Sequence, residues 1–253
     1  MLRPLLLALC LFAVPGAAES LRGIKGADDR QVVPAGVYPW SAVGRVNNSN
    51  GGQCSGVLIG PRLAVTAAHC LWNRRTRAWM PVASLHFVAG WERGAYLGAA
   101  RVSATRVSTA FDPSRPYSAA LAAVDWALLE LDADLGTQVG WVGLGAAPTP
   151  ESELVTVGYG QDRPHVPTAH RGCAMTGLGE GGIIHHECDA VHGDSGAPVL
   201  VWQGESPSLA AIHVATFTMK DGRVLGGAVP VPAFAAAARS MGAGRESRPP
   251  TRP

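Results

Sequence analysis

A serine stands between glycines in Gly193-Asp194-Ser195-Gly196, and an apolar run follows it. This pattern suits a nucleophile on a tight turn that leads into a buried strand, because glycine adopts backbone angles that a Cβ blocks. The amide groups of Gly193 and Ser195 can then converge on one point, as an oxyanion hole requires. Turns in general are rich in glycine and serine. A catalytic serine therefore also needs a histidine base and an acid that orients it.

Two further stretches contain those residue types. His69 ends an apolar segment and precedes Cys70, while Asp125 opens a second apolar segment. The neighbours of Asp125 are too apolar for an unpaired carboxylate, and a histidine imidazole would satisfy it. His69 would act as general base toward Ser195 and then as general acid toward the leaving amine. The alternatives for the orienting acid are Asp112 and Asp132.

Three motifs follow one another along the chain: Thr66-Ala67-Ala68-His69-Cys70, Asp125-Trp126-Ala127-Leu128-Leu129 and Gly193-Asp194-Ser195-Gly196-Ala197-Pro198. Over roughly residues 28 to 240 the chain resembles the trypsin-like (chymotrypsin-fold) serine peptidases, whose three catalytic motifs have this order. The resemblance implies a triad of His69, Asp125 and Ser195. It implies an oxyanion hole at the amides of Gly193 and Ser195, and peptide-bond hydrolysis through an acyl-enzyme. It also implies an all-β fold of two packed six-stranded antiparallel β-barrels with a short C-terminal helix.

The chain combines features of two branches of that family. Asp28-Asp29-Arg30 is more like the bacterial glutamyl-endopeptidase (V8-like) branch, which usually carries Asn where this chain has Asp194. In the trypsin-like branch the corresponding Asp pairs with a freshly cut N-terminus of the Ile-Val-Gly-Gly type. The stretch Arg22-Gly23-Ile24-Lys25-Gly26 approximates that sequence poorly. We therefore expect no cleavage of the trypsinogen type.

The resemblance also implies a pocket for the substrate residue before the scissile bond, formed by Asp189, Ala190, His192, His213, Val214, Ala215 and Thr216. Three specificities stay open for it. An Asp189 carboxylate facing the pocket would select Arg or Lys, and the sequence favours this alternative. His213 resembles the histidine with which V8-like enzymes hold a substrate Glu, although Ala190 replaces their hydroxyl residue. Val214-Ala215-Thr216 stands where glycines normally open the pocket, and would suit small or medium side chains.

Residues 1–18 have the organisation of a secretory signal, with a basic Arg3, an apolar stretch from Leu5 to Val14 and a cleavage site after Ala18. The stretch is too short to span a membrane, so we expect a secreted or periplasmic protein without a membrane anchor. Removal of the signal leaves four cysteines, and an even number in an exported protein indicates two disulfides. Spacing and the family resemblance favour Cys54–Cys70, which leaves Cys173–Cys188 as the second pair.

Short apolar runs alternate with turns rich in Gly, Pro, Asn and Asp through most of the chain. Many short strands without helical crossovers predict an all-β fold. We expect a signal peptide at 1–18, an N-terminal arm or short propeptide at 19–30, and a peptidase domain at 31–241 with the barrel seam near 140–152. An Ala-rich stretch at 232–241 predicts the closing helix, and 242–253 has the composition of a disordered tail.

The 253 residues are 47% hydrophobic and 16% charged, which supports one large domain or two small ones with a sizeable core. A net charge of +2 indicates neither nucleic-acid nor membrane-surface binding. The run from His185 to His192 opens like a zinc-protease motif, but Ala190 stands where the second histidine is needed. We expect no metal and no cofactor, and a monomer whose partner is a peptide or protein substrate.

Two other function classes are alternatives to the peptidase. A catalytically silent secreted binding protein on the same fold usually lacks one member of the triad, whereas this chain keeps all three. An esterase of the α/β-hydrolase type would need the order Ser, acid, His. The order here is His, Asp, Ser, which speaks against that class. The sequence therefore favours a secreted serine endopeptidase, with the silent binding protein as the alternative.

Overall fold

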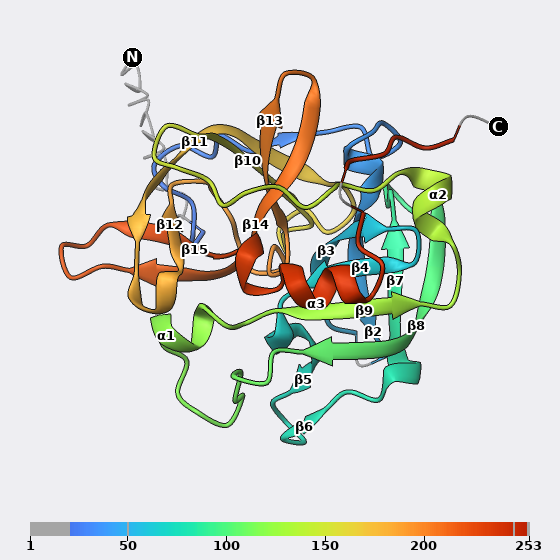
Figure 1. Cartoon of the computed structure of the whole chain (residues 1–253). Helices are drawn as coiled ribbons and strands as arrows, with labels where there is room; N and C mark the ends of the chain where they lie inside the picture. Colours follow the sequence, from blue (N-terminus) through green and yellow to red (C-terminus); the bar gives the residue numbers. More distant parts are fainter. Residues whose placement is uncertain (1–20, 50, 245, 252–253) are drawn as a thin grey trace, which may run out of the picture.

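The computed structural model describes residues 21–49, 51–244 and 246–251, so the predicted signal peptide at 1–18 lies outside the described residues. Strands dominate the described part, and they form two antiparallel barrels packed against each other (Figure 1). The first barrel is coloured blue to green and the second mostly yellow to red. The expected all-β fold of two six-stranded barrels with a short C-terminal helix is confirmed.

The first barrel closes in the strand order β2-β3-β4-β9-β8-β7. Its strands are β2 (Val43–Asn48), β3 (Gln53–Gly60), β4 (Leu63–Thr66), β7 (Leu85–Ala89), β8 (Gly98–Val107) and β9 (Ala127–Leu131). All four residues of β4 are buried, and β9 is buried except for Glu130. These two strands pair in the barrel wall, and they carry the chain toward His69 and away from Asp125.

The second barrel comprises β10 (Glu153–Gly158), β11 (Thr168–Leu178), β12 (Ile184–His186), β13 (Pro198–Gln203), β14 (Ser206–Thr218) and β15 (Val224–Pro230). Its order is β11-β10-β13-β14-β15-β12, and the pairing of β11 with β12 closes the ring. A seventh strand, β1 (Gln31–Val32), adds to the outer edge of β11. The chain crosses from the first barrel to the second between β9 and β10.

Short helices and a small hairpin connect these strands. The helical segments are η1 (Trp40–Ala42), η2 (Ala68–Leu71), η3 (Val82–Ser84), α1 (Ala119–Ala122), α2 (Leu135–Val139), η4 (Glu180–Gly182), η5 (Val231–Ala233) and α3 (Ala235–Ser240). The hairpin is formed by β5 (Trp72–Asn73) and β6 (Ala78–Trp79). In the described part of the chain no helix has the length and apolarity needed to cross a membrane.

One large apolar cluster runs through both barrels. It includes Phe87 and Leu128 from the first barrel and Leu200 and Ile212 from the second. A smaller cluster fills the second barrel around Leu154 and the second disulfide. Both expected disulfides, Cys54–Cys70 and Cys173–Cys188, are present. The shared cluster makes the two barrels one folding unit, which fixes the relative position of side chains that project from each.

The described residues of the predicted tail at 242–253 make several contacts with the domain. The Gly244 amide donates to the Ile59 carbonyl over 2.7 Å. Trp141 and Arg248 exchange two backbone hydrogen bonds of 2.9 Å, and the Arg248 guanidinium lies 5.3 Å from the Trp141 ring centroid. The composition indicates only that the tail has no core of its own. The tail is ordered because it satisfies backbone groups that the two barrels already present.

Candidate active site

His69 and Asp125 form a hydrogen-bonded pair at the edge of the first barrel. His69 lies in η2, directly after β4, and Asp125 lies just before β9. Because β4 and β9 are neighbouring antiparallel strands, the end of one meets the start of the other. Nδ1 of His69 lies 2.6 Å from one carboxylate oxygen, and the His69 amide donates to the other over 2.9 Å. Asp125 is fully buried, so this pairing satisfies a carboxylate that could not otherwise remain charged there.

The pair determines which ring nitrogen of His69 is available. An ionised carboxylate only accepts hydrogen bonds, so Nδ1 must carry the proton. Nε2 of the neutral ring is then an acceptor with a free lone pair. The His69 side chain is 23% exposed, so this nitrogen can reach a substrate-side group.

Tyr117 is a third member of this arrangement that sequence reasoning missed. Its hydroxyl donates to Oδ2 of Asp125 over 2.6 Å, the same oxygen that receives Nδ1 of His69. The hydroxyl is also 3.3 Å from the Val214 carbonyl of β14. Burial and the neighbouring Asp125 charge raise the pKa of Tyr117, so it remains a donor at all ordinary pH values. Tyr117 precedes Asp125 by eight residues in a loop, and no sequence motif marked it.

Ser195 is placed against the first barrel by its own backbone. Its carbonyl accepts from the Ser55 amide of β3 over 2.9 Å and lies 3.8 Å from Sγ of Cys70, the residue after His69. At the next position φ is +83°, and a Cβ there would collide with the Ser55 carbonyl and the Thr66 hydroxyl. Only glycine therefore permits this close approach of the two barrels. Within the described residues the Ser195 hydroxyl makes no hydrogen bond, which leaves it free to turn toward a substrate.

The turn before Ser195 directs a backbone amide toward the substrate side. The His192 carbonyl accepts from the Gln161 amide over 2.6 Å. Since C=O and N–H of one planar peptide point in opposite directions, the Gly193 amide points away from Gln161. Gly193 has φ of +102°, and a Cβ there would press against the Tyr159 carbonyl. In the described part of the chain the amides of Gly193 and Ser195 have no internal acceptor.

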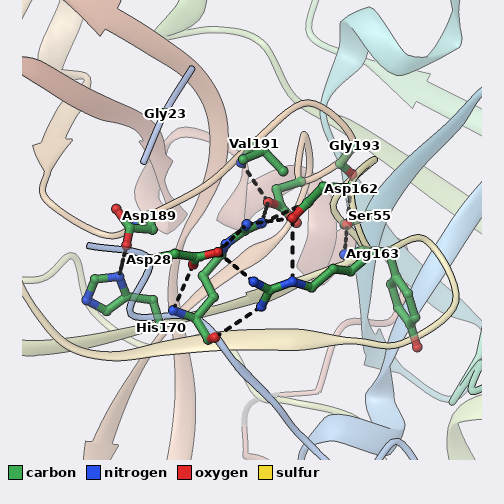
Figure 2. Close-up of polar contacts among 12 residues, drawn as sticks. Gly23, Asp28, Ser55, Asp162, Arg163, His170, Asp189, Val191 and Gly193 are labelled. Carbon is green, nitrogen blue, oxygen red and sulfur yellow. Dashed lines mark hydrogen bonds and ion pairs between the residues drawn. The ribbon is translucent and has the colours of Figure 1, made fainter. Parts of the chain in front are cut away.

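A buried ionic cluster lies beneath this turn (Figure 2). The Arg30 side chain, 2% exposed, binds Asp28 and Asp162 and lies 3.9 Å from Asp194. The Asp194 carboxylate accepts the Val191 amide over 2.8 Å. Burial raises the pKa of Asp194 to about 7, against the opposing effects of that amide and of Arg30. Arg30 therefore anchors the N-terminal arm under the turn that carries Ser195.

The carboxylate of Asp189 is used inside the protein. Its two oxygens accept the amides of Lys25 over 2.8 Å and Asp29 over 3.1 Å. Nδ1 of His170 lies 3.3 Å from one of these oxygens (Figure 2). Burial alone would raise the pKa of Asp189, but His170 and the two amides outweigh it and lower that pKa. Within the expected arm at 19–30, the residues from Gly23 onward contact the second barrel, through Gly23, Lys25 and Asp29. The expectation that Asp189 faces a substrate pocket receives no support from these contacts.

Two buried histidines lie beside Asp189. The Cys188 amide donates to Nδ1 of His186 over 3.2 Å, so that nitrogen is an acceptor. Burial lowers the pKa of His213 to about 3 and holds that of His186 well below its usual value, so both rings are neutral at pH 7. Nε2 of His186 then carries a proton, which it donates to Nδ1 of His213 across 3.1 Å. The proton of His213 is consequently on Nε2.

The remaining residues predicted for the substrate pocket are partly brought together. Ala190 and Val214 are buried, while His192 is exposed. Gly23 of the arm lies between the Ala190 carbonyl, with which its own Cβ would collide, and the Thr216 hydroxyl. The arm thus forms one wall of this region, a role that the sequence did not indicate. Ala215 lies between Val214 and Thr216 on β14, opposite Gly227 of β15.

The sulfur atoms of Cys54 and Cys70 lie within 4.8 Å of a ring nitrogen of His69. Three such ligand atoms could bind a metal if the cysteines were thiolates. The two sulfurs are joined in a disulfide, so they do not offer that ligand set. The cluster is better understood as the disulfide that holds η2 against β3.

The sequence matches the model of the family described as Trypsin over residues 29–238. The chain belongs to the trypsin family. It is 27% identical over 187 residues to a glutamyl endopeptidase from Bacillus licheniformis, an alignment that covers 73% of this chain and 56% of that relative. The chain therefore spans little more than half the length of this curated relative. A solved structure, described as a Glu endopeptidase in complex with MPD, superposes with a TM-score of 0.72 at 20% identity, covering 86% of this chain and 98% of that one.

The three hydrogen bonds to Asp125 generate a prediction for Tyr117. Tyr117→Phe removes one donor from the oxygen that holds His69 and leaves the ring size unchanged. A hydrogen bond to a charged group contributes roughly 1.5–3 kcal/mol, so we expect kcat to fall about tenfold with little change in KM.

The matched control is Tyr96→Phe, because Tyr96 is 56% exposed and lies outside the contacts of the pair. Steady-state kinetics from pH 5 to pH 9, with melting temperatures to exclude unfolding, provide the measurement. A Tyr117→Phe profile identical to that of the control would show that the hydroxyl does not position Asp125.

Asp194 generates a prediction about stability and pH. Its pKa is about 7 in the folded protein and 3.8 in a model peptide, so the folded state keeps a proton that the unfolded state releases. The contribution of Asp194 to stability is therefore present at acidic pH and is lost as the pH rises from about 4 to about 7. A difference of three pKa units corresponds to at most about 4 kcal/mol. We expect Asp194→Asn to flatten the decline of stability across this interval.

Urea unfolding at several pH values between 4 and 8 tests this expectation. Glu205→Gln, which changes an exposed carboxylate, should keep the wild-type dependence. Parallel curves for Asp194→Asn and the wild type would mean that Arg30 keeps Asp194 ionised throughout.

Proposed function

We propose that the protein is a serine endopeptidase in which Ser195 attacks the carbonyl carbon of a peptide bond. The observation that carries the proposal is the hydrogen-bonded pair of His69 and Asp125 next to the turn of Ser195. Nε2 of His69, the unprotonated ring nitrogen, takes the proton of the serine hydroxyl as the bond forms. It then gives that proton to the departing amine, and water repeats the sequence on the acyl-enzyme. Asp125 holds the ring and stabilises the imidazolium.

The developing oxyanion would be bound by the amides of Gly193 and Ser195. The direction of the His192 carbonyl supports this assignment, because it turns the Gly193 amide away from Gln161 and leaves that amide without an acceptor among the described residues. Each such donor typically contributes a factor of a hundred or more to kcat. The backbone of the turn is held from below by Asp194 and Arg30, so both donors are positioned before substrate arrives.

We propose that the protein acts outside the cytoplasm. The signal-like residues 1–18 and two disulfides, one of which braces His69, support export. A disulfide next to the catalytic base is a reasonable device only where oxidising conditions maintain it.

For the residue before the scissile bond, we propose an acidic side chain. Asp189, whose charge would have selected Arg or Lys, is bound by Lys25, Asp29 and His170. The histidine pair instead leaves an N–H donor on Nε2 of His213. A donor pairs with a carboxylate and repels a cation. The Bacillus licheniformis relative is a glutamyl endopeptidase, which agrees with this choice.

Covalent labelling tests the catalytic proposal and separates it from the silent binding protein. A fluorophosphonate probe should add one adduct to the wild type, at Ser195, as peptide mapping by mass spectrometry will show. Ser195→Ala should lose the adduct and lower kcat by about a million-fold. Ser49→Ala is the control, because Ser49 is exposed on the first barrel. Unchanged hydrolysis by Ser195→Ala, or an unlabelled wild type, would favour the silent binding protein.

A series of fluorogenic peptides that differ only before the scissile bond tests the pocket. We expect kcat/KM to decrease from Glu to Gln by about tenfold or more, since a hydrogen bond to a charged group is the stronger one. Lys and Arg should be the poorest substrates. Preferential cleavage after Arg or Lys that disappears in Asp189→Asn would restore the basic specificity and overturn this assignment.

A further inference from the structure

A pocket of about 410 Å³ opens beside His69, and its lining includes no residue of the Gly193 turn. One wall is the β5–β6 hairpin, which projects from the first barrel (Figure 1). The opposite wall is the loop from Phe111 to Tyr117. This volume lies in the range of small-ligand sites and exceeds what a single carboxylate needs. None of the preceding assignments uses it.

Three arginines, Arg74, Arg77 and Arg115, line this pocket, and its lining contains no acidic residue. All three are exposed, and the ion pairs found in the described part of the chain do not include them. The carboxylate nearest to Arg115 in sequence is Asp112, whose side chain accepts hydrogen bonds from Ser114. The pocket therefore has a positive rim. Asp112 offsets part of the Arg115 charge, while the described ion pairs include none of the three guanidinium groups.

The walls that carry these arginines are braced by aromatic contacts. Trp72 and Trp79 meet edge to face across the hairpin at 5.2 Å. Trp79 also lies 6.4 Å from Phe111 on the opposite wall. The turn of the hairpin is held by Asn73, whose side chain accepts the amides of Arg75 and Thr76. The apolar floor and the fixed walls resemble a binding site for the stem of a side chain, with the arginines at its end.

The position of Tyr117 indicates which part of a substrate would enter. Tyr117 forms part of the pocket wall, and its hydroxyl lies 3.3 Å from the Val214 carbonyl. Val214 begins the segment assigned to the residue before the scissile bond. The pocket therefore adjoins the segment assigned to that subsite, and His69 and Tyr117 both line it. A substrate chain that passes Val214 would bring its preceding side chain over the three arginines.

We propose that this pocket binds an acidic side chain of the substrate, at the residue that precedes the one before the scissile bond. The inference rests on the proposed peptidase function and adds a second determinant to it. Guanidinium groups pair well with carboxylates, while exposed ion pairs contribute modestly. Discrimination of about three- to tenfold between Glu and Gln at this position is therefore expected.

The test uses quenched fluorogenic peptides that carry the optimal residue before the scissile bond and either Glu or Gln at the position preceding it. For the wild type at low salt, kcat/KM should be about three- to tenfold higher with Glu. The ratio should fall toward one in the triple variant Arg74→Gln, Arg77→Gln, Arg115→Gln. It should also fall as added salt screens the charges, because the Debye length shrinks from about 30 Å at 0.01 M to about 3 Å at 1 M.

Arg75→Gln is the matched control, since Arg75 lies on the same hairpin and outside the pocket lining. It should keep the wild-type ratio. A wild-type ratio of one, or a ratio that persists in the triple variant, would overturn the proposal. A second peptide pair carries Glu or Gln on the leaving-group side. Discrimination confined to that pair would overturn the placement on the acyl side.

A binding experiment distinguishes failure of the pocket proposal from failure of the peptidase proposal. Fluorescein-labelled versions of the first peptide pair are titrated into Ser195→Ala, with anisotropy as the readout. Tighter binding of the Glu peptide, lost in the triple variant made on this background, supports the pocket even if the wild type hydrolyses nothing. Equal binding of the two peptides together with slow cleavage of both rejects the pocket and leaves the peptidase assignment intact.

Discussion

The catalytic arrangement depends on one joint between the barrels, at Ser55. This buried residue of β3 donates its amide to the Ser195 carbonyl and its hydroxyl to the Gly193 carbonyl over 3.0 Å. Its oxygen also accepts the Tyr159 amide over 2.8 Å. The first barrel supplies the candidate base and the second the candidate nucleophile, so their distance is set by how the barrels meet. Three hydrogen bonds from one small side chain and its backbone fix that meeting, and Gly196 removes the Cβ that would prevent it.

A second constraint is the placement of buried charge. Three carboxylates, those of Asp125, Asp189 and Asp194, are almost completely buried near the site. A set of hydrogen bonds or nearby charges offsets the cost of burying each one. Asp125 contacts His69 and Tyr117. Asp189 contacts the N-terminal arm and His170, and Asp194 contacts Val191 and lies near Arg30. Two of these three depend on the arm. The segment before β1 is therefore part of the machinery that shapes the turn of Ser195.

Much of the fold and of the candidate triad could be predicted from sequence because those features are local. Each motif couples a chemical residue to an apolar strand, and short strands separated by turn residues define the class. The roles of Tyr117 and of the docked arm could not be predicted, because they depend on contacts between residues far apart in sequence. Tyr117 contacts Val214, which is 97 positions away, and Lys25 of the arm contacts Asp189, which is 164 positions away. The spacing of Asp189 from Ser195 is visible in the sequence, whereas the direction of its carboxylate depends on the distant Lys25 and Asp29 amides. A carboxylate turns toward the strongest donors available, and here these belong to the arm. The contacts of the tail could not be predicted for a similar reason, because its partners, Ile59 and Trp141, lie far away in sequence.

Hydrogen bonding within the protein also decides which donors and acceptors are left for a substrate. Hydrogen bonds within the protein pair the carboxylates of Asp125 and Asp189, while Oδ1 of Asp194 has no hydrogen-bond partner among the described residues. In the proposed specificity, the groups left for a substrate are the N–H of a neutral His213 and the guanidinium groups of three arginines beside His69. Neutral imidazoles require less compensation than charged ones when buried, which allows a donor at the base of a pocket without a counterion. A peptide rich in carboxylates would supply acceptors to both places, whereas a basic peptide would meet unsatisfied donors and like charge. The interior pairing of Asp189 thus determines the polarity of the surface that substrates encounter.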